Sequence, residues 1–195
     1  LSREENMMTG EVTSEQKRIE LPQMTEPVKA IFIDPRQQWL YVINGRALAD
    51  VFSLRDNSLN GRYKLLEDGN AEVTASTQLV GGISLIVGNS KGGLAQWFMA
   101  RDPDGEQRFK QIRTFQMGTT PIVEISAEER RKGFTALDAA GNFGVFHSTA
   151  HRTLLVDPVV DGQGVYGMSP RANRVIVEAG GKLQPLLLDN PHPEV

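Results

Sequence analysis

The sequence has no cysteine among its 195 residues. This absence excludes disulfide bonds, thiolate catalysis and zinc sites with thiolate ligands, although it does not decide the compartment. No apolar run approaches the roughly 20 residues of a membrane-spanning helix, and no signal-peptide pattern is seen. The net charge is only −3, with a pI of about 5.7, so no overall basic field favours nucleic acid or an anionic membrane as a partner.

A polar, glycine-rich turn between two strand-like runs is the clearest structural signal that is present. Residues 83–87 are mainly apolar and β-branched, and residues 94–99 alternate and end in aromatic and apolar side chains. Between them, residues 89–93 consist of Asn, Ser, Lys and two Gly. Asn and Gly tolerate the positive φ that a tight turn needs. The stretch therefore predicts an antiparallel β-hairpin.

The same pattern recurs along the chain. Innermost strands are predicted to begin at Val28, Val73, Ile122 and Val165, at intervals of 45, 49 and 43 residues. A period of about 40–45 residues built of four strands is typical of a β-propeller blade. We therefore predict an all-β, propeller-like array of about four antiparallel, four-stranded blades. It is WD40-like but lacks the Trp-Asp and Gly-His signatures.

The predicted units cover residues 17–54, 62–99, 108–147 and 152–188, and residues 1–16 are predicted to form a loop. Each unit has an outer strand followed by three inner ones. Both ends of the chain resemble cut points, so we expect a fragment of a larger propeller. The outer strand Arg18–Leu21 could pair with the last strand, Leu183–Leu188, and close a ring. An open arc of blades, or self-association of two copies through open blade edges, are the alternatives.

Three local patterns suggest ligands, and each has a simpler structural explanation. The loop 88–93 lacks the Walker spacing and a following helix, which favours a hairpin turn over a phosphate site. The acidic loop 102–106 lacks the further ligands of a calcium site. His147 and His151 lie on a predicted strand end and loop, where a spacing of four does not bring them together as metal ligands. We therefore expect no cofactor, no metal and no enzymatic activity, because no catalytic set stands out.

Basic residues recur in or near the first turn of three of the four units. We predict that they gather on one rim of the array, as weak candidates for contact with an anion or a partner: Arg36, Arg130, Arg131, Lys132, Arg171 and Arg174. The simpler interpretation is a solvated rim, where charges are common. Strand aromatics such as Trp39 and Trp97 are expected in the core between blades, and a stacking platform for a ligand is the weaker alternative.

Long continuous stretches resemble the large extracytoplasmic insert in phosphate ABC-transporter permease subunits of Gram-negative proteobacteria. The resemblance covers nearly the whole chain and does not depend on a short motif. It is carried by DPRQQWLYVINGRA, LNGRYKLLEDG, QLVGGISLIVG, ALDAAG with FGVFHSTAHRTLLV, and RVIVEAGGKLQPL with DNPHPEV. It implies a propeller-like domain on the periplasmic side of the inner membrane. The membrane helices that carry transport in that family are absent here, so no transport residue is carried over.

The resemblance implies a non-catalytic domain, itself soluble, of an integral inner-membrane protein. Its expected role is protein contact or regulation of phosphate import. The implied partners are the periplasmic phosphate-binding protein and other permease subunits, with phosphate itself as a further candidate ligand. The alternative is a generic β-propeller scaffold for protein interaction that is unrelated to phosphate.

Overall fold

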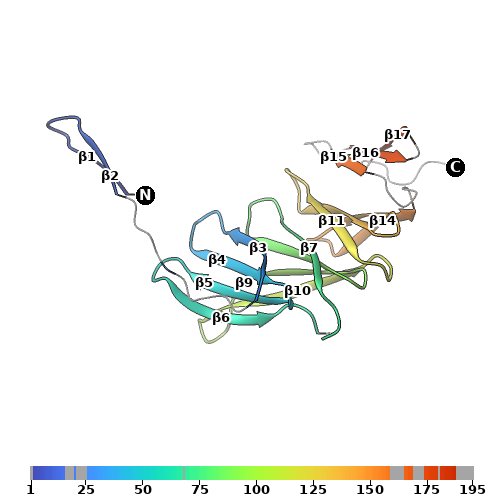
Figure 1. Cartoon of the computed structure of the whole chain (residues 1–195), viewed down its shortest axis with the longest axis horizontal. Helices are drawn as coiled ribbons and strands as arrows, with labels where there is room; N and C mark the ends of the chain where they lie inside the picture. The colour runs from blue at the N-terminus through green and yellow to red at the C-terminus, as the bar shows by residue number, and fades with distance from the viewer. Residues whose placement is uncertain are drawn as a thin grey trace.

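A computed structural model of the chain shows strands joined by turns (Figure 1). It describes residues 2–15, 20, 26–67, 69–158, 165–168, 174–179 and 181–187. No helix occurs in this described part, so the prediction of an all-β chain is confirmed. Within the same residues, no segment qualifies as a helix that could span a membrane.

Four antiparallel sheets follow one another along the chain, and within each sheet the strand order follows the sequence. The first sheet consists of β3 Val28–Ile33, β4 Trp39–Asn44, β5 Leu48–Ser53 and β6 Ser58–Lys64. The second consists of β7 Val73–Gln78, β8 Ser84–Asn89, β9 Gly93–Arg101 and β10 Gln107–Gln116. The third consists of β11 Ile122–Ala127, β12 Gly133–Asp138, β13 Asn142–His147 and β14 Arg152–Pro158. The fourth consists of β15 Val165–Met168, β16 Arg174–Ala179 and β17 Lys182–Leu187.

One type of turn joins the second and third strands of the first three sheets. Its first residue is Asn44, Asn89 or Asp138, and the side-chain Oδ1 of that residue accepts bonds from two backbone N–H groups of the turn at 2.8–3.1 Å. Three positions later the chain has a positive φ, at Ala47, Gly92 and Gly141. Short Asn and Asp side chains favour such turns because they can bond to their own backbone. The predicted turns at Asn44, Asn89 and Gly141 are thus present, and they share one hydrogen-bonding pattern.

Glycine is required at one of these turns because another segment approaches closely. Gly92 has a φ of +76°, and a Cβ added there would lie 2.5 Å from the backbone oxygen of Gly118. Gly105, in the loop between β9 and β10, has a φ of +87° but no atom within 4 Å of an added Cβ. The two glycines therefore separate the effect of backbone strain from the effect of crowding.

Replacing Gly105 with Ala is expected to lower the free energy of unfolding by about 1 kcal/mol, through left-handed strain alone. Replacing Gly92 with Ala should lower it by about 2 kcal/mol, because the methyl group also displaces the backbone at Gly118. Urea unfolding of both variants measures the difference. Equal losses would show that the segment at Gly118 yields without cost.

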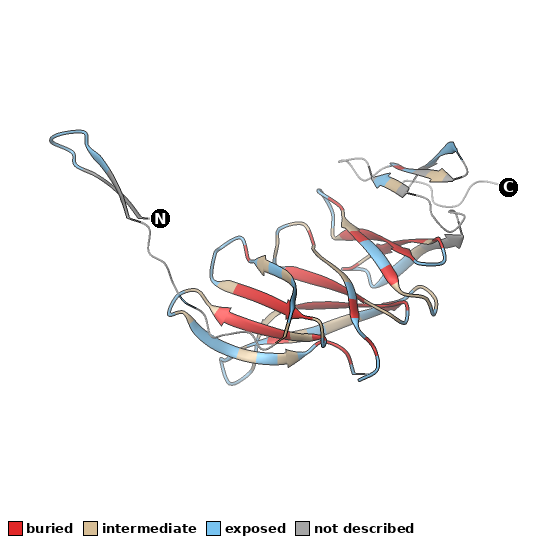
Figure 2. Ribbon diagram, in the orientation of Figure 1, coloured by how far each residue is buried: buried red, intermediate tan, exposed pale blue. Residues whose placement is uncertain are grey.

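Apolar clusters lie between successive sheets (Figure 2). The cluster between the first and second sheets includes Tyr41, Ile43 and Val51 on one side and Leu85, Val87, Trp97 and Phe109 on the other. The cluster between the second and third sheets includes Ile86, Leu94 and Phe115 against Ile122, Phe134 and Phe146. Because alternate residues of a strand point to opposite faces, the middle sheet contributes to both clusters.

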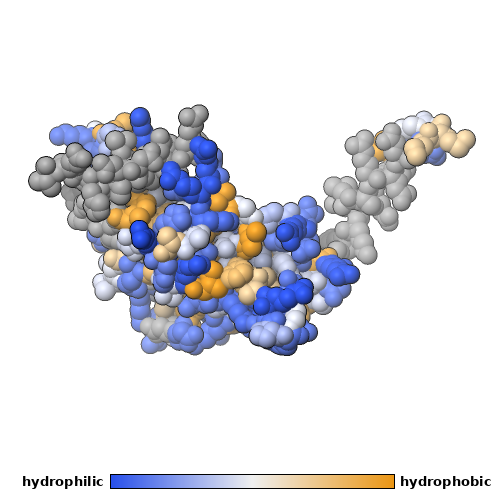
Figure 3. Space-filling model, turned by 180° about the vertical axis from the view of Figure 1, so that it is seen from behind, coloured by the Kyte–Doolittle hydropathy of each residue, from blue (hydrophilic) through white to orange (hydrophobic). Residues whose placement is uncertain are grey.

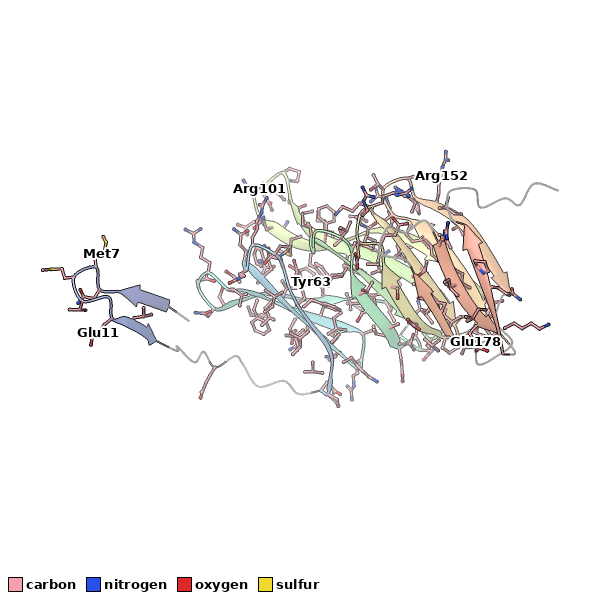
Figure 4. The ribbon with its side chains drawn as sticks, turned by 90° about the horizontal axis from the view of Figure 1, so that it is seen from above. Met7, Glu11, Tyr63, Arg101, Arg152 and Glu178 are labelled. Carbon is pink, nitrogen blue, oxygen red and sulfur yellow. The ribbon has the colours of Figure 1, made fainter. Side chains whose placement is uncertain are left out.

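The fourth sheet packs on the third through Tyr166. The Tyr166 ring lies 4.7 Å from that of Phe143, and the hydroxyl of Thr135 donates to the Tyr166 oxygen at 3.2 Å. The sheets therefore form a series, with the first and fourth at opposite ends. Seen from above, Tyr63 lies in the first sheet and Glu178 in the last (Figure 4).

Two sequence predictions about the N-terminal part need correction or fall outside the described residues. Residues 1–16 were expected to form a loop, but β1 Ser2–Glu5 and β2 Val12–Glu15 pair as an antiparallel hairpin around a turn at Met7–Thr9. The hairpin projects away from the sheets (Figure 1). Most of the outer strand expected at Arg18–Leu21 lies outside the described residues, so ring closure through it is not tested.

The predicted unit boundaries also differ from those of the sheets. The units 62–99, 108–147 and 152–188 each join an outer strand to the three strands that follow it, whereas that outer strand belongs to the preceding sheet. The reason is the register: β6, for example, pairs with β5 through Asp50↔Arg62. The described part of the fourth sheet has three strands.

Candidate interaction site on the rim

The turns that join the first and second strands of the first three sheets lie next to one another. They comprise residues 34–38, 79–83 and 128–132, and we call them the rim. A Cβ on Gly82 would lie 2.6 Å from Cγ of Pro35, so the first two turns are in contact. The ammonium group of Lys132 donates to the carbonyl of Val80, which links the second turn to the third. Equivalent turns of successive sheets thus form one continuous edge.

A pocket of about 220 Å³ opens at the rim between the first and second sheets. Its wall is mixed in chemistry. The apolar part comes from Pro35, Trp39, Ile83 and Met99, and the polar part from Asp34, Arg36, Gln38, Tyr41 and Gln107, with Gly81 at the edge. Ile83 is 53% exposed. An apolar side chain of a partner, flanked by a polar or negative group, fits this combination.

Asp34 organises the turn, and its carboxylate is occupied by hydrogen bonds to the backbone. Its carboxylate accepts bonds from the backbone N–H of Arg36 at 3.1 Å and from those of Gln38 and Trp39 at 2.6 Å each. These bonds explain why a carboxylate can be buried here with no cationic partner among the residues that the structure describes. They also position Arg36, whose side chain is exposed at the mouth of the pocket.

Tyr41 lines the pocket and brings a phenolic hydroxyl group to it. It is 2% exposed. Burial raises the pKa of Tyr41 well above its usual range, and the negative charge of Asp34 raises it further. The side chain therefore stays neutral and keeps its O–H as a donor.

The predicted basic residues are distributed unevenly over the rim. Arg36 lies in the first turn, and Arg130, Arg131 and Lys132 lie in the third. Arg174 begins β16 and is exposed, and Arg171 lies outside the described residues. The third turn is not purely basic, because Nε of Arg131 lies 3.9 Å from Oε2 of Glu128. The gathering of cations on one edge is seen for the first and third turns, whereas binding of an anion there stays a prediction.

Sequence reasoning did not identify Tyr41, Ile83 and Met99 as neighbours of Arg36. The sequence signal was present only in part: alternation on β4 places Trp39 and Tyr41 on one face of the strand. Ile83 and Met99 come from the second sheet, and their approach depends on how two sheets pack. The pocket is therefore a property of the sheet interface, which no single-strand pattern contains.

The titratable side chains of the described residues do not gather into a metal site. No group of three or more His, Cys, Asp or Glu side chains there could hold a metal ion. His147 Nδ1 accepts a bond from the Ala150 N–H, and His151 Nε2 lies 2.8 Å from the Thr114 carbonyl oxygen, so both rings have local partners. Another hollow of about 330 Å³ lies by Lys91 and Gln116, but the Gln116 amide already donates to the carbonyls of Lys91 and Gly118.

Comparison of the sequence with models of known protein families finds no match, and comparison with curated proteins finds no significant match.

Proposed function

We propose that the chain is a non-catalytic interaction domain that binds another protein through its rim. The observation that carries the proposal is the pocket beside Arg36. It combines an exposed guanidinium group, the neutral hydroxyl of Tyr41 and an apolar wall. An exposed apolar residue bordered by polar groups is typical of a protein contact.

We further infer that the four sheets are blades of a propeller. The three complete sheets share the same turn, and each has a bulge near the start of its first strand, after Val28, Val73 and Ile122. Identical local devices at matching positions are typical of repeated blades. The described sheets form an open series rather than a ring, so the inference concerns the repeated unit and not the closure.

The resemblance of long stretches to the insert of phosphate transporter permeases supports a more specific proposal. The domain would act on the periplasmic side of the inner membrane, in docking the periplasmic phosphate-binding protein or in contact with other permease subunits. Phosphate itself is a secondary candidate for Arg36 and the cations of the third turn, since guanidinium groups suit phosphate. A general β-propeller scaffold unrelated to phosphate is the alternative that the same rim supports.

Calorimetric titration of the chain with purified phosphate-binding protein, and separately with inorganic phosphate, distinguishes these proposals. Binding of the protein but not of phosphate supports docking. The variant Arg36→Ala should then weaken binding about tenfold, which is typical of an interface arginine. Arg46→Ala is the matched control, because Arg46 is 74% exposed and lies in the turn at the opposite end of β4.

Three outcomes count against the specific proposal. No heat with either ligand leaves only the scaffold function. Equal weakening by Arg36→Ala and Arg46→Ala would place the contact away from the rim. Binding of phosphate that survives Arg36→Ala would exclude a phosphate site at this pocket.

A further inference from the structure

One face of the first sheet points away from the second sheet. It corresponds to the face by which the second and third sheets each pack against the preceding sheet. The shared turn aligns the sheets, so Leu40 and Val42 correspond to Leu85 and Val87 of the second sheet. Leu85 and Val87 pack against the first sheet, in the first apolar cluster. Leu40 and Val42 form a small cluster with Phe52 on the opposite side from the second sheet. We call this side the leading face.

The third sheet repeats this arrangement. Its residues at the same distances from the turn are Phe134 and Ala136, and both are buried against the second sheet. Phe52 corresponds in the same way to Trp97 and Phe146, which lie in the two intersheet clusters. In the second and third sheets, therefore, the residues at these positions pack against the preceding sheet. The first sheet carries the same apolar pattern, but the sheet that precedes it, the hairpin β1–β2, projects away from it (Figure 1).

The part of the leading face that β3 forms is exposed to solvent, whereas the equivalent part of the third sheet is buried. Ile31 pairs with Val42, and Ile125 of the third sheet pairs with Ala136 at the equivalent place. Ile125 is 9% exposed, whereas Ile31 is 60% exposed and its neighbour on the same face, Ile33, is 50% exposed. The centre of the face, at Val42 and Phe52, is already buried. The open area is thus the strip along β3.

The fourth sheet has an open face at the other end of the series. Val175 is fully buried, and the next residue, Ile176, is 47% exposed. Because adjacent residues of a strand point to opposite faces, Ile176 points away from the third sheet. We call this side of the fourth sheet the trailing face. Leu183, which is 72% exposed, also lies on it, as does Pro185, which pairs with Ile176 in the strand register. Isolated apolar patches are also visible among hydrophilic side chains on the back of the molecule (Figure 3).

The two end faces also offer one pair of opposite charges, although the trailing face carries Arg174 as well. On the leading face, Asp50 stands where the second and third sheets have Ala95 and Gly144. It is 2% exposed and is bound by Arg62 at 2.6 Å and 2.9 Å. The Arg62 side chain is 51% exposed, so it retains N–H donors for a second carboxylate. On the trailing face, Glu178 pairs with Leu183 beside the turn between β16 and β17, the end that corresponds to Arg62.

We propose that the leading face of one copy of this chain binds the trailing face of a second copy. The contact is head-to-tail, since it joins two different surfaces. It continues the face-to-face packing of sheets along the series, with Ile31 and Ile33 against Ile176 and Leu183 and with Glu178 near Arg62. It differs from pairing of strand edges, which joins backbones by hydrogen bonds. The proposal does not depend on the function proposed for the rim.

Sedimentation velocity over a broad range of protein concentrations tests the proposal. The wild-type chain is expected to associate reversibly. Ile31→Asp and Ile176→Asp should each weaken association about 30-fold or more, because each places a charge in an apolar contact. Val123→Asp is the matched control: Val123 is 51% exposed and lies on the edge strand β11, but not on an end face. It should leave association unchanged. Far-UV circular dichroism checks that all three variants are folded.

Mixing the two end-face variants makes the test specific for a head-to-tail contact. Ile31→Asp keeps its trailing face, and Ile176→Asp keeps its leading face, so a mixture retains one intact contact that neither variant forms alone. Association in the mixture above that of either variant supports the proposal. A wild-type chain that stays monomeric throughout, an unchanged Ile176→Asp variant, or a mixture no better than its components each overturns it.

Discussion

Replacing Phe109 with Ala is expected to lower the free energy of unfolding by about 4 kcal/mol. Phe109 is 2% exposed and lies on β10, at the interface of the first two sheets. Its ring is 5.3 Å from that of Trp97 in a stacked arrangement, 5.1 Å from Tyr41 and 5.8 Å from Tyr63. Removing it leaves a cavity that three other rings border, and these rigid neighbours can fill the space only in part.

Phe98→Ala is the control for this prediction. Phe98 lies on the adjacent strand β9, opposite Lys110, and is only partly buried. Its loss should cost about 1–2 kcal/mol, because less apolar area returns to water. Urea unfolding measures both variants. If Phe109→Ala cost no more than Phe98→Ala, the aromatic cluster would not be what holds the first two sheets together. Because Tyr41 contacts Phe109 and lines the rim pocket, the Phe109→Ala variant should also weaken the binding of any ligand in that pocket.

Replacing Asp138 with Ala is expected to cost about 3–4 kcal/mol, since it leaves buried donors without an acceptor. Asp138 is 2% exposed. Its Oδ1 accepts bonds from the backbone N–H of Ala140 and Asn142, and its Oδ2 accepts from the Asn142 amide at 2.7 Å and the Thr120 hydroxyl at 2.5 Å. The carboxylate thus joins the turn to the segment that precedes β11.

Asp138→Asn separates the turn from the charge. Asn occupies the equivalent place in the first two sheets, so this variant should keep the two turn bonds. It should lose the acceptor for Thr120 and Asn142 and cost about 1–2 kcal/mol. Thermal or urea unfolding of both variants gives the comparison. An Asn variant as unstable as the Ala variant would mean that the turn bonds contribute little.

The same pair of proteins predicts a pH dependence. Burial alone would raise the pKa of Asp138, but bonds from Asn142, Thr120 and the backbone N–H groups outweigh it and hold the pKa below its ordinary value of 3.8. A carboxyl group whose pKa is lower in the folded state stabilises that state above its unfolded pKa, and the contribution is lost as the pH falls through the folded value. The difference in stability between wild type and Asp138→Asn should therefore shrink on acidification below about pH 4. A difference that is constant with pH would contradict this.

Much of the local structure follows from short sequence signals. Asn44-Gly45 and the turn at Asn89–Gly93 combine a side chain that can bond to its own backbone with a residue that accepts positive φ. Such a turn reverses the direction of the chain, so the two strands that it joins pair as a hairpin. The start of each first strand at Val28, Val73, Ile122 and Val165 is the same in sequence and structure, because the repeat fixes it four times over.

Features that depend on pairing between segments could not be predicted in the same way. Residues 1–16 lack apolar alternation, which is why a loop was expected, yet the turn at Asn6–Gly10 pairs Glu5 with Val12. The rim cations show a related limit. Their places in equivalent turns followed from the repeat, but the partners of Lys132 and Arg131 depend on neighbouring backbone and on Glu128. The wall of the pocket beside Arg36 is formed by residues of two sheets, so no single segment predicts it.

The serial arrangement of the sheets has a consequence for how the chain folds and unfolds. Each internal sheet has two neighbours, while each end sheet has one among the described residues. In such a one-dimensional array, stability is approximately a sum of unit and nearest-neighbour terms. Opening therefore starts at the ends and proceeds inward, and amide protons of the second and third sheets exchange last. A ligand that covers either end converts an outermost unit into an internal one, and it raises the cooperativity of the whole array.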